Sequence, residues 1–209
     1  MIQVENLILV GSGDYKKVFE YPTDKNKLIK VMHPERVASD GGFKKHGFLK
    51  RKTMQGVYRQ FRREILQYLQ LCKNDYSRKA YQMPIEIPYG LAATNAGLGL
   101  VVEKVEAPAG IPQSLGYLAK NNLLESKHKK ALVLFFQECR DLHVVYGEVN
   151  ADGIMYTERR NGRPEFVLVD GIGEKLLIPV RSWFKTNNDR YISKIEKKIK
   201  VQLEIDDEK

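Results

Sequence analysis

Two glycines near the N-terminus, Gly11 and Gly13, flank Ser12 directly after an apolar run. Glycine has no side chain to keep a phosphate away from the backbone, so a Gly-Ser-Gly turn between two strands can bring its amide groups close to a phosphate. A polyphosphate also needs a cation, and Lys30 lies in a candidate strand beneath this turn. Taken alone, the Gly-Ser-Gly sequence is more simply an ordinary hairpin turn; together with the features that follow it along the chain, it indicates a phosphate site made by Gly11, Ser12, Gly13 and Lys30.

Two carboxylates are candidates to complete this site. A lysine in a half-buried pocket needs an anionic partner, and we assign that role to Glu64 in the next predicted helix. Asp170 follows an apolar strand and offers the hard oxygen that magnesium prefers. Each residue also has a simpler explanation: Lys30 facing solvent, Glu64 pairing with a base four residues away on its helix, or Asp170 ending a strand in a turn. We favour the functional interpretation because several such features occur in order along the chain: a Gly-rich turn, a strand lysine, a helix glutamate and an aspartate after a later strand.

The elements that must position these residues are mainly strands in the first half of the chain. Apolar runs and turn residues predict strands at 6–10, 17–21 and 27–32, and a hairpin of 89–94 with 98–105. From about Thr53 the spacing becomes helical, with one apolar face formed by Val57, Phe61, Ile65, Tyr68 and Leu69.

The second half reads as mainly helical. After a linker at 107–112, Ser126 is the predicted N-cap of a helix that runs to about His143, with a buried stripe of Leu132, Phe135, Phe136, Cys139 and Leu142. A hairpin of 153–158 with 165–169 turns at Asn161-Gly162, and a last helix covers 189–203. We therefore expect an α+β protein of two lobes, 1–106 with a small antiparallel sheet and 107–209 with mainly helices.

The order of these features resembles that of protein kinases: a Gly-rich loop, a strand lysine, a helix glutamate, a catalytic loop and a metal-binding aspartate. More narrowly, the chain resembles the YrbL family of PhoP-regulatory-network proteins, a compact kinase-like group in bacteria. The closest points are the opening from Leu9 to Val18 and the closing run Asp-Gly-Ile-Gly-Glu-Lys-Leu-Leu-Ile-Pro from Asp170. The likeness implies ATP and magnesium as ligands, with Glu148 as the catalytic carboxylate beside Lys30 and Asp170.

Several positions depart from the kinase pattern. The third glycine of the loop falls at Lys16, and the catalytic motif is Tyr-Gly-Glu, ending at Glu148 instead of an aspartate. The expected lysine is Asn150, and the second magnesium ligand, an asparagine in kinases, is Gly153; Asp152 and Asn150 are displaced substitutes. Two interpretations therefore stay open: a kinase-like phosphotransferase of unknown acceptor, or a pseudokinase that regulates a partner without turnover.

Basic charge is concentrated in one segment. The chain has 35 Lys and Arg against 26 Asp and Glu, a net charge of +9. Residues 35–63 hold nine basic and two acidic residues, and they lie between the two partners Lys30 and Glu64. A third interpretation is thus an anionic-partner binder, with an acidic protein or substrate as its ligand. Nucleic acid is disfavoured because aromatic residues are few in this segment and no nucleic-acid motif occurs.

The rest of the composition indicates a compartment. Cys72 and Cys139 are far apart and form no metal or disulfide pattern, which suits a reducing environment. The N-terminus lacks the features of a signal peptide, and no segment has the roughly 20 apolar residues that cross a bilayer. We expect a cytoplasmic protein without a membrane span.

Overall fold

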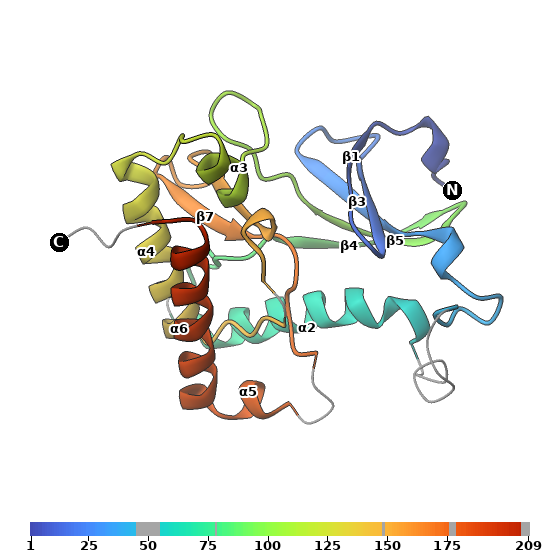
Figure 1. Cartoon of the computed structure of the whole chain (residues 1–209). Helices are drawn as coiled ribbons and strands as arrows, with labels where there is room; N and C mark the ends of the chain where they lie inside the picture. The colour runs from blue at the N-terminus through green and yellow to red at the C-terminus, as the bar shows by residue number, and fades with distance from the viewer. Residues whose placement is uncertain (45–54, 78, 148, 176–178, 206–209) are drawn as a thin grey trace. The chain divides into compact units, whose positions relative to one another are not determined.

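The computed structural model describes residues 1–44, 55–77, 79–147, 149–175 and 179–205 (Figure 1). The chain forms two compact units, the first of Met1–Ile65 and Ile87–Lys104, the second of Leu66–Glu86 and Val105–Lys209. The chain passes for the last time from the first unit to the second between Lys104 and Val105. The first unit is interrupted, however, because the chain enters the second unit at Leu66 and returns at Ile87.

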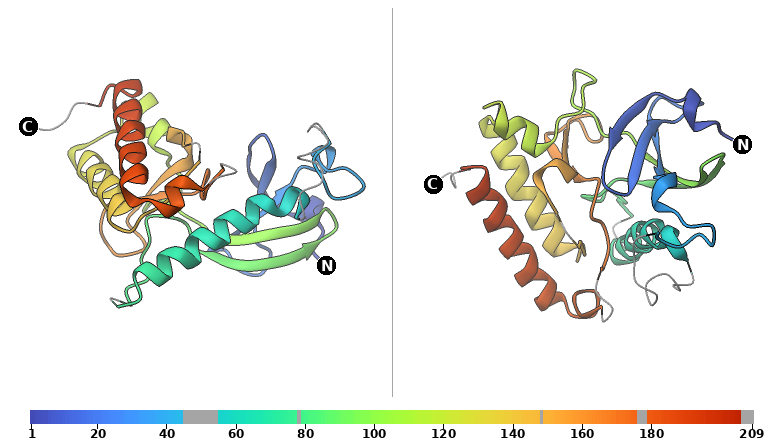
Figure 2. Two further views of the ribbon diagram at one scale, coloured as in Figure 1. Left: turned by 90° about the horizontal axis from the view of Figure 1, so that it is seen from below. Right: turned by 45° about the vertical axis from the view of Figure 1, so that its right-hand side comes forward.

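A five-stranded antiparallel sheet forms the first unit (Figures 1 and 2). Its strands are β1 (Leu9–Ser12), β2 (Lys16–Glu20), β3 (Lys27–Met32), β4 (Pro88–Thr94) and β5 (Gly97–Glu103), in the order β1-β2-β3-β5-β4. The strand predicted over 27–32 is confirmed as β3, with the same bounds. The first strand was predicted over 6–10, but Val4–Asn6 form a 3-10 turn and the strand runs on to Ser12. Gly11 and Ser12 therefore belong to a strand, and the turn itself begins at Gly13.

The sheet buries both of its faces. On one face, Met32, Leu100 and Val102 pack against Val57 and Phe61. The opposite face is covered by the N-terminal residues and contains Phe19, Ile29, Val31 and Val101. Because side chains alternate along a strand, Lys30 emerges on the same face as Met32.

Helix α2 (Arg59–Asn74) lies on that face and follows a 3-10 turn at Gly56–Tyr58. The predicted apolar stripe is correct for Val57 and Phe61, which are fully buried, but wrong for Leu69, which is 56% exposed. The buried positions of the helix are instead Phe61, Glu64, Gln67 and Leu71. This spacing of three and four residues keeps one helix face inward, so the glutamate lies among the buried side chains.

Helices dominate the second unit. They are α3 (Leu115–Lys120), α4 (Ser126–Asp141), α5 (Val180–Trp183) and α6 (Lys185–Gln202), together with the hairpin β6 (Ile154–Thr157) and β7 (Glu165–Leu168). Helices α4 and α6 lie side by side, and α4 also packs on β7 (Figures 1 and 2). The predicted stripe of α4 is confirmed, since all five of its residues are buried. The mixed architecture confirms the α+β prediction, while α3 was missed.

Helix α4 begins one residue earlier than the sequence suggested. Its N-cap is Glu125 instead of Ser126, in a capping box with His128. The Glu125 backbone amide donates to His128 Nδ1 at 3.0 Å. That nitrogen must be unprotonated to accept, so the cap requires a neutral imidazole.

We expect this cap to make stability depend on pH. Burial, and to a lesser extent the charge of Lys127, lowers the pKa of His128 below its ordinary value near 6.5. The unfolded chain then binds the proton more readily than the folded chain, so stability falls as pH drops through about 6.5. The melting temperature between pH 8 and pH 5 should fall less for His128→Gln, whose amide caps without titrating. Parallel curves for the two proteins would contradict the prediction.

Candidate functional site

Lys30 of β3 and Glu64 of α2 form an ion pair between the helix and the sheet face on which it packs. Lys30 Nζ lies 3.3 Å from Glu64 Oε2, and the two residues are only 4% and 5% exposed. The lysine comes from the middle of β3, between Val18 on β2 and Leu100 on β5. Strand pairing and helix packing thus place together two residues that are 34 positions apart.

A second lysine contacts the same carboxylate. Lys16 Nζ lies 2.8 Å from Glu64 Oε1, so each oxygen of Glu64 binds a different ammonium group. Lys16 begins β2 opposite Met32, and Lys30 lies two residues from that partner, on the same face of the sheet. Sequence reasoning recorded Lys16 only as a missing glycine. Lys16, Val18 and Glu20 are at alternate positions of β2, so their side chains lie on the same face of the sheet. Because Val18 pairs with Lys30, this alternation was the signal that could have placed Lys16 in the site.

The turn after β1 is tied to the end of β3. The Gly13 amide donates to the Lys16 carbonyl at 2.9 Å, which closes the hairpin. His33 Nε2 lies 2.9 Å from the Gly13 carbonyl and 3.3 Å from Ser12 Oγ. Because the carbonyl can only accept, Nε2 carries the proton. Sequence reasoning missed His33, which holds the Gly-rich turn in place.

Glu35 contacts the other side of the same imidazole. His33 Nδ1 lies 2.8 Å from Glu35 Oε1. A hydrogen bond from its own backbone amide, with a smaller contribution from the charge of His33, lowers the pKa of Glu35. The carboxylate is therefore ionised at neutral pH and lies beside the ring that holds Gly13.

Neither predicted phosphate-binding glycine is required by the fold. A Cβ added at Gly11 would meet nothing within 4 Å, and one at Gly13 would meet only the Lys16 carbonyl at 3.9 Å. Neither residue has the positive φ that favours glycine. Gly99 differs, because a Cβ there would lie 2.6 Å from Ile29 atoms. The surface over β1 is thus open to an approaching group.

In the second unit, the segment before the predicted catalytic residue is fixed against the segment after Asp170. The Gly147 amide donates to the Gly171 carbonyl, and the Gly173 amide donates to the Val145 carbonyl, both at 2.8 Å. Glu148 itself lies outside the described residues. The backbone nonetheless brings the two predicted loops together within one unit.

Asp170 is exposed at the end of β7, and Gly153 lies beside it. A Cβ added at Gly153 would lie 3.5 Å from the Asp170 Cβ. The two displaced substitutes are engaged elsewhere. Asn150 Oδ1 accepts from the Gly153 amide at 2.8 Å, and Asp152 Oδ1 accepts from Ser114 Oγ at 3.0 Å. The described residues contain no group of three or more His, Cys, Asp or Glu that could hold a metal.

Arg181, which sequence reasoning missed, binds both of these loops. Its guanidinium donates to Glu174 Oε2 at 3.1 Å and to the Tyr146 carbonyl at 2.9 Å. It also lies over the Tyr191 ring of α6, 4.2 Å from the centroid, and the Tyr191 hydroxyl donates to the Gly147 carbonyl. Burial raises the pKa of the Tyr146 phenol, which therefore stays protonated. Arg181 is a structural anchor for Tyr146 and Gly147.

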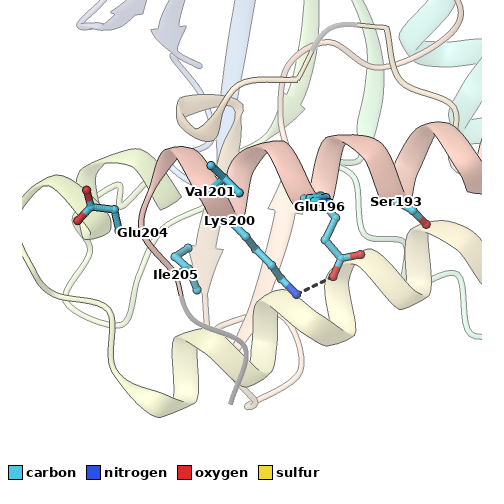
Figure 3. A pocket seen from close by; sticks show the side chains of 7 residues that line it. Ser193, Glu196, Lys200, Val201, Glu204 and Ile205 are labelled. Atoms are coloured by element: carbon cyan, nitrogen blue, oxygen red, sulfur yellow. Dashed lines mark ion pairs between the residues drawn. The ribbon is translucent and has the colours of Figure 1, made fainter. Parts of the chain in front are cut away.

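A hollow of about 530 Å³ elsewhere in the second unit contains none of these residues. Its lining comes from the end of α6 and the residues after it, including the ion pair of Lys200 and Glu196 at 2.9 Å (Figure 3). It adds nothing to the candidate site. Across the described residues, no helix combines the length and apolar character needed to cross a bilayer.

The arrangement defines a class of protein. An antiparallel sheet, a lysine in its third strand and a buried glutamate from the following helix are the features of a protein-kinase-like α+β fold. The particular family is equally plain: the chain belongs to the family described as PhoP regulatory network protein YrbL, which it matches over residues 2–204. This confirms the resemblance drawn from the opening and closing motifs.

No curated protein matches the chain. Among solved structures, it is similar to the crystal structure of the Mycobacterium tuberculosis PknI kinase domain, a double mutant, at 10% identity with a TM-score of 0.43. The similarity covers 78% of this chain and 56% of that one, so the chain spans little more than half of that kinase domain.

Proposed function

We propose that this protein binds ATP through the first unit, with Gly11, Ser12 and Gly13 facing the phosphates and Lys30 supplying positive charge. The observation that carries the proposal is the buried ion pair of Lys30 and Glu64. Burying two charged groups costs free energy, and two hydrophobic residues at these positions would stabilise the core at least as well. A buried ion pair therefore indicates a role other than stability. The fold does not require glycine at Gly11 or Gly13, because a Cβ would fit at either position. Glycines there are consistent with a ligand that approaches the backbone closely.

Magnesium is the second part of the proposal, with Asp170 as its protein ligand. The aspartate is exposed and offers hard oxygens, which fits this ion. Magnesium commonly binds through one or two carboxylates together with substrate phosphates. A site with one carboxylate should therefore take up magnesium only with the nucleotide.

A regulatory module without turnover is the second candidate. Gly153 has no side chain at the position beside Asp170, and Asn150 and Asp152 are held by other hydrogen bonds. These contacts favour nucleotide binding over efficient transfer, because fewer ligands neutralise the reacting phosphates. The third interpretation, an anionic partner bound by residues 35–63, rests on a segment of which 45–54 lie outside the described residues.

Thermal unfolding tests the proposed binding. A ligand that binds the folded state raises stability by RT ln(1 + [L]/Kd), so millimolar ATP with magnesium should raise the melting temperature clearly. Magnesium alone should not, and Lys30→Met should reduce the nucleotide effect. Absence of a shift with any nucleotide, with or without magnesium, would rule out the proposal.

A further inference from the structure

Three charged side chains meet at one point in the first unit. The Glu64 carboxylate bridges Lys16 from β2 and Lys30 from β3, at 2.8 and 3.3 Å. The lysine side chains are 12% and 5% exposed, and that of the glutamate 6%. The shorter of the two contacts belongs to Lys16, the residue that the assigned site leaves out.

We propose that Lys16 is a second phosphate-binding cation, which acts together with Lys30 when the nucleotide binds. This inference rests on the proposed nucleotide site and extends it. The hairpin places Lys16 three residues after Gly13, whose amide its carbonyl accepts. Lys16 therefore begins the strand that leaves this turn, and its side chain lies on the same sheet face as that of Lys30.

Electrostatics favours shared binding. A triphosphate carries several negative charges, which a single ammonium group neutralises only in part. Lys16 and Lys30 are diagonal neighbours on one sheet face, where like charges repel unless an anion lies between them. Glu64 supplies that anion without the nucleotide, and a phosphate can replace one of its contacts. The flexible four-carbon stem of lysine lets Lys16 turn to the phosphate without a change in the backbone.

The competing explanation is purely structural, with Lys16 fastening β2 to α2. The two explanations differ in their dependence on phosphate. A phosphate ligand affects ATP more than AMP, because its contact exists only where the phosphate does. If Lys16 only holds β2 against α2, its substitution should weaken the binding of AMP, ADP and ATP to the same extent.

The experiment compares the dissociation constants of AMP, ADP and ATP, each with magnesium, for the natural protein and Lys16→Met. Loss of one charged hydrogen bond should weaken ATP binding by about tenfold to a hundredfold. AMP binding should change much less, and Lys16→Arg should keep most of the ATP affinity. The matched control is Lys17→Met, which removes the same charge from the opposite face of β2.

The outcomes separate this inference from the proposed function. An equal loss for all three nucleotides, or no loss for ATP, would overturn the role of Lys16 and leave nucleotide binding intact. If the natural protein binds none of the three, both proposals are wrong. In support of shared binding, Lys30→Met should retain measurable ATP affinity, and Lys16→Met with Lys30→Met should lose it.

Discussion

Glu64→Gln should lower the free energy of unfolding by about 3–5 kcal/mol, the usual cost of removing one partner from a buried ion pair. The amide cannot neutralise Lys16 and Lys30, which stay close together on one sheet face with little access to water. For a chain of this size, such a loss corresponds to a fall in melting temperature of about 6–20 °C. Denaturant unfolding and calorimetry without nucleotide both measure it.

A partly buried ion pair in the first unit, more exposed than that of Lys30 and Glu64, provides the control. Lys104 Nζ lies 2.8 Å from Glu20 Oε1, with 32% of the glutamate side chain exposed. Glu20→Gln should cost no more than about 1 kcal/mol, because water already screens this pair. Combining Glu64→Gln with Lys16→Met should recover part of the loss, since one ammonium group is removed. Equal losses in the free energy of unfolding for Glu64→Gln and Glu20→Gln would contradict the prediction that the buried pair contributes more to stability.

Phosphoryl transfer should be slow in the natural protein and should increase in Gly153→Asn. Glutamate has one methylene more than the aspartate of kinases, a difference of about 1 Å in reach, and displacement on that scale costs on the order of a hundredfold. The new side chain would start 3.5 Å from the Asp170 Cβ, an ordinary contact, and would place an amide oxygen beside Asp170, the proposed metal ligand. We expect at least a tenfold gain, on the order of what one charge-stabilising group contributes.

The assay is a long incubation with labelled ATP. Gly153→Ala is the matched control, since it adds the same Cβ without an oxygen and should leave the rate unchanged. Glu148→Gln and Asp170→Asn should each remove the signal. Equal signal in all variants would indicate a contaminating kinase, and rapid turnover by the natural protein would contradict our interpretation of the loop.

Local pattern determined much of this protein from the sequence alone. The alternation of 27–32 placed Lys30 in a strand, Asn161-Gly162 marked a hairpin, and the closing run at Asp170 indicated the family. These features are set by residues close together in the sequence, so hydrophobic periodicity and the residue preferences of turns are enough to predict them. The pairing of Lys30 with Glu64 was also anticipated, although only from the order of the motifs.

Tertiary structure alone decided which side chains share the site. Lys16 is 48 positions from Glu64, and their contact follows from the register of β2 against β3 and from the face that α2 presents. His33 and Arg181 hold loops through backbone carbonyls, which no side-chain pattern reveals. Sequence periodicity specifies which face of an element is buried, but strand register and helix packing determine which distant residues meet there.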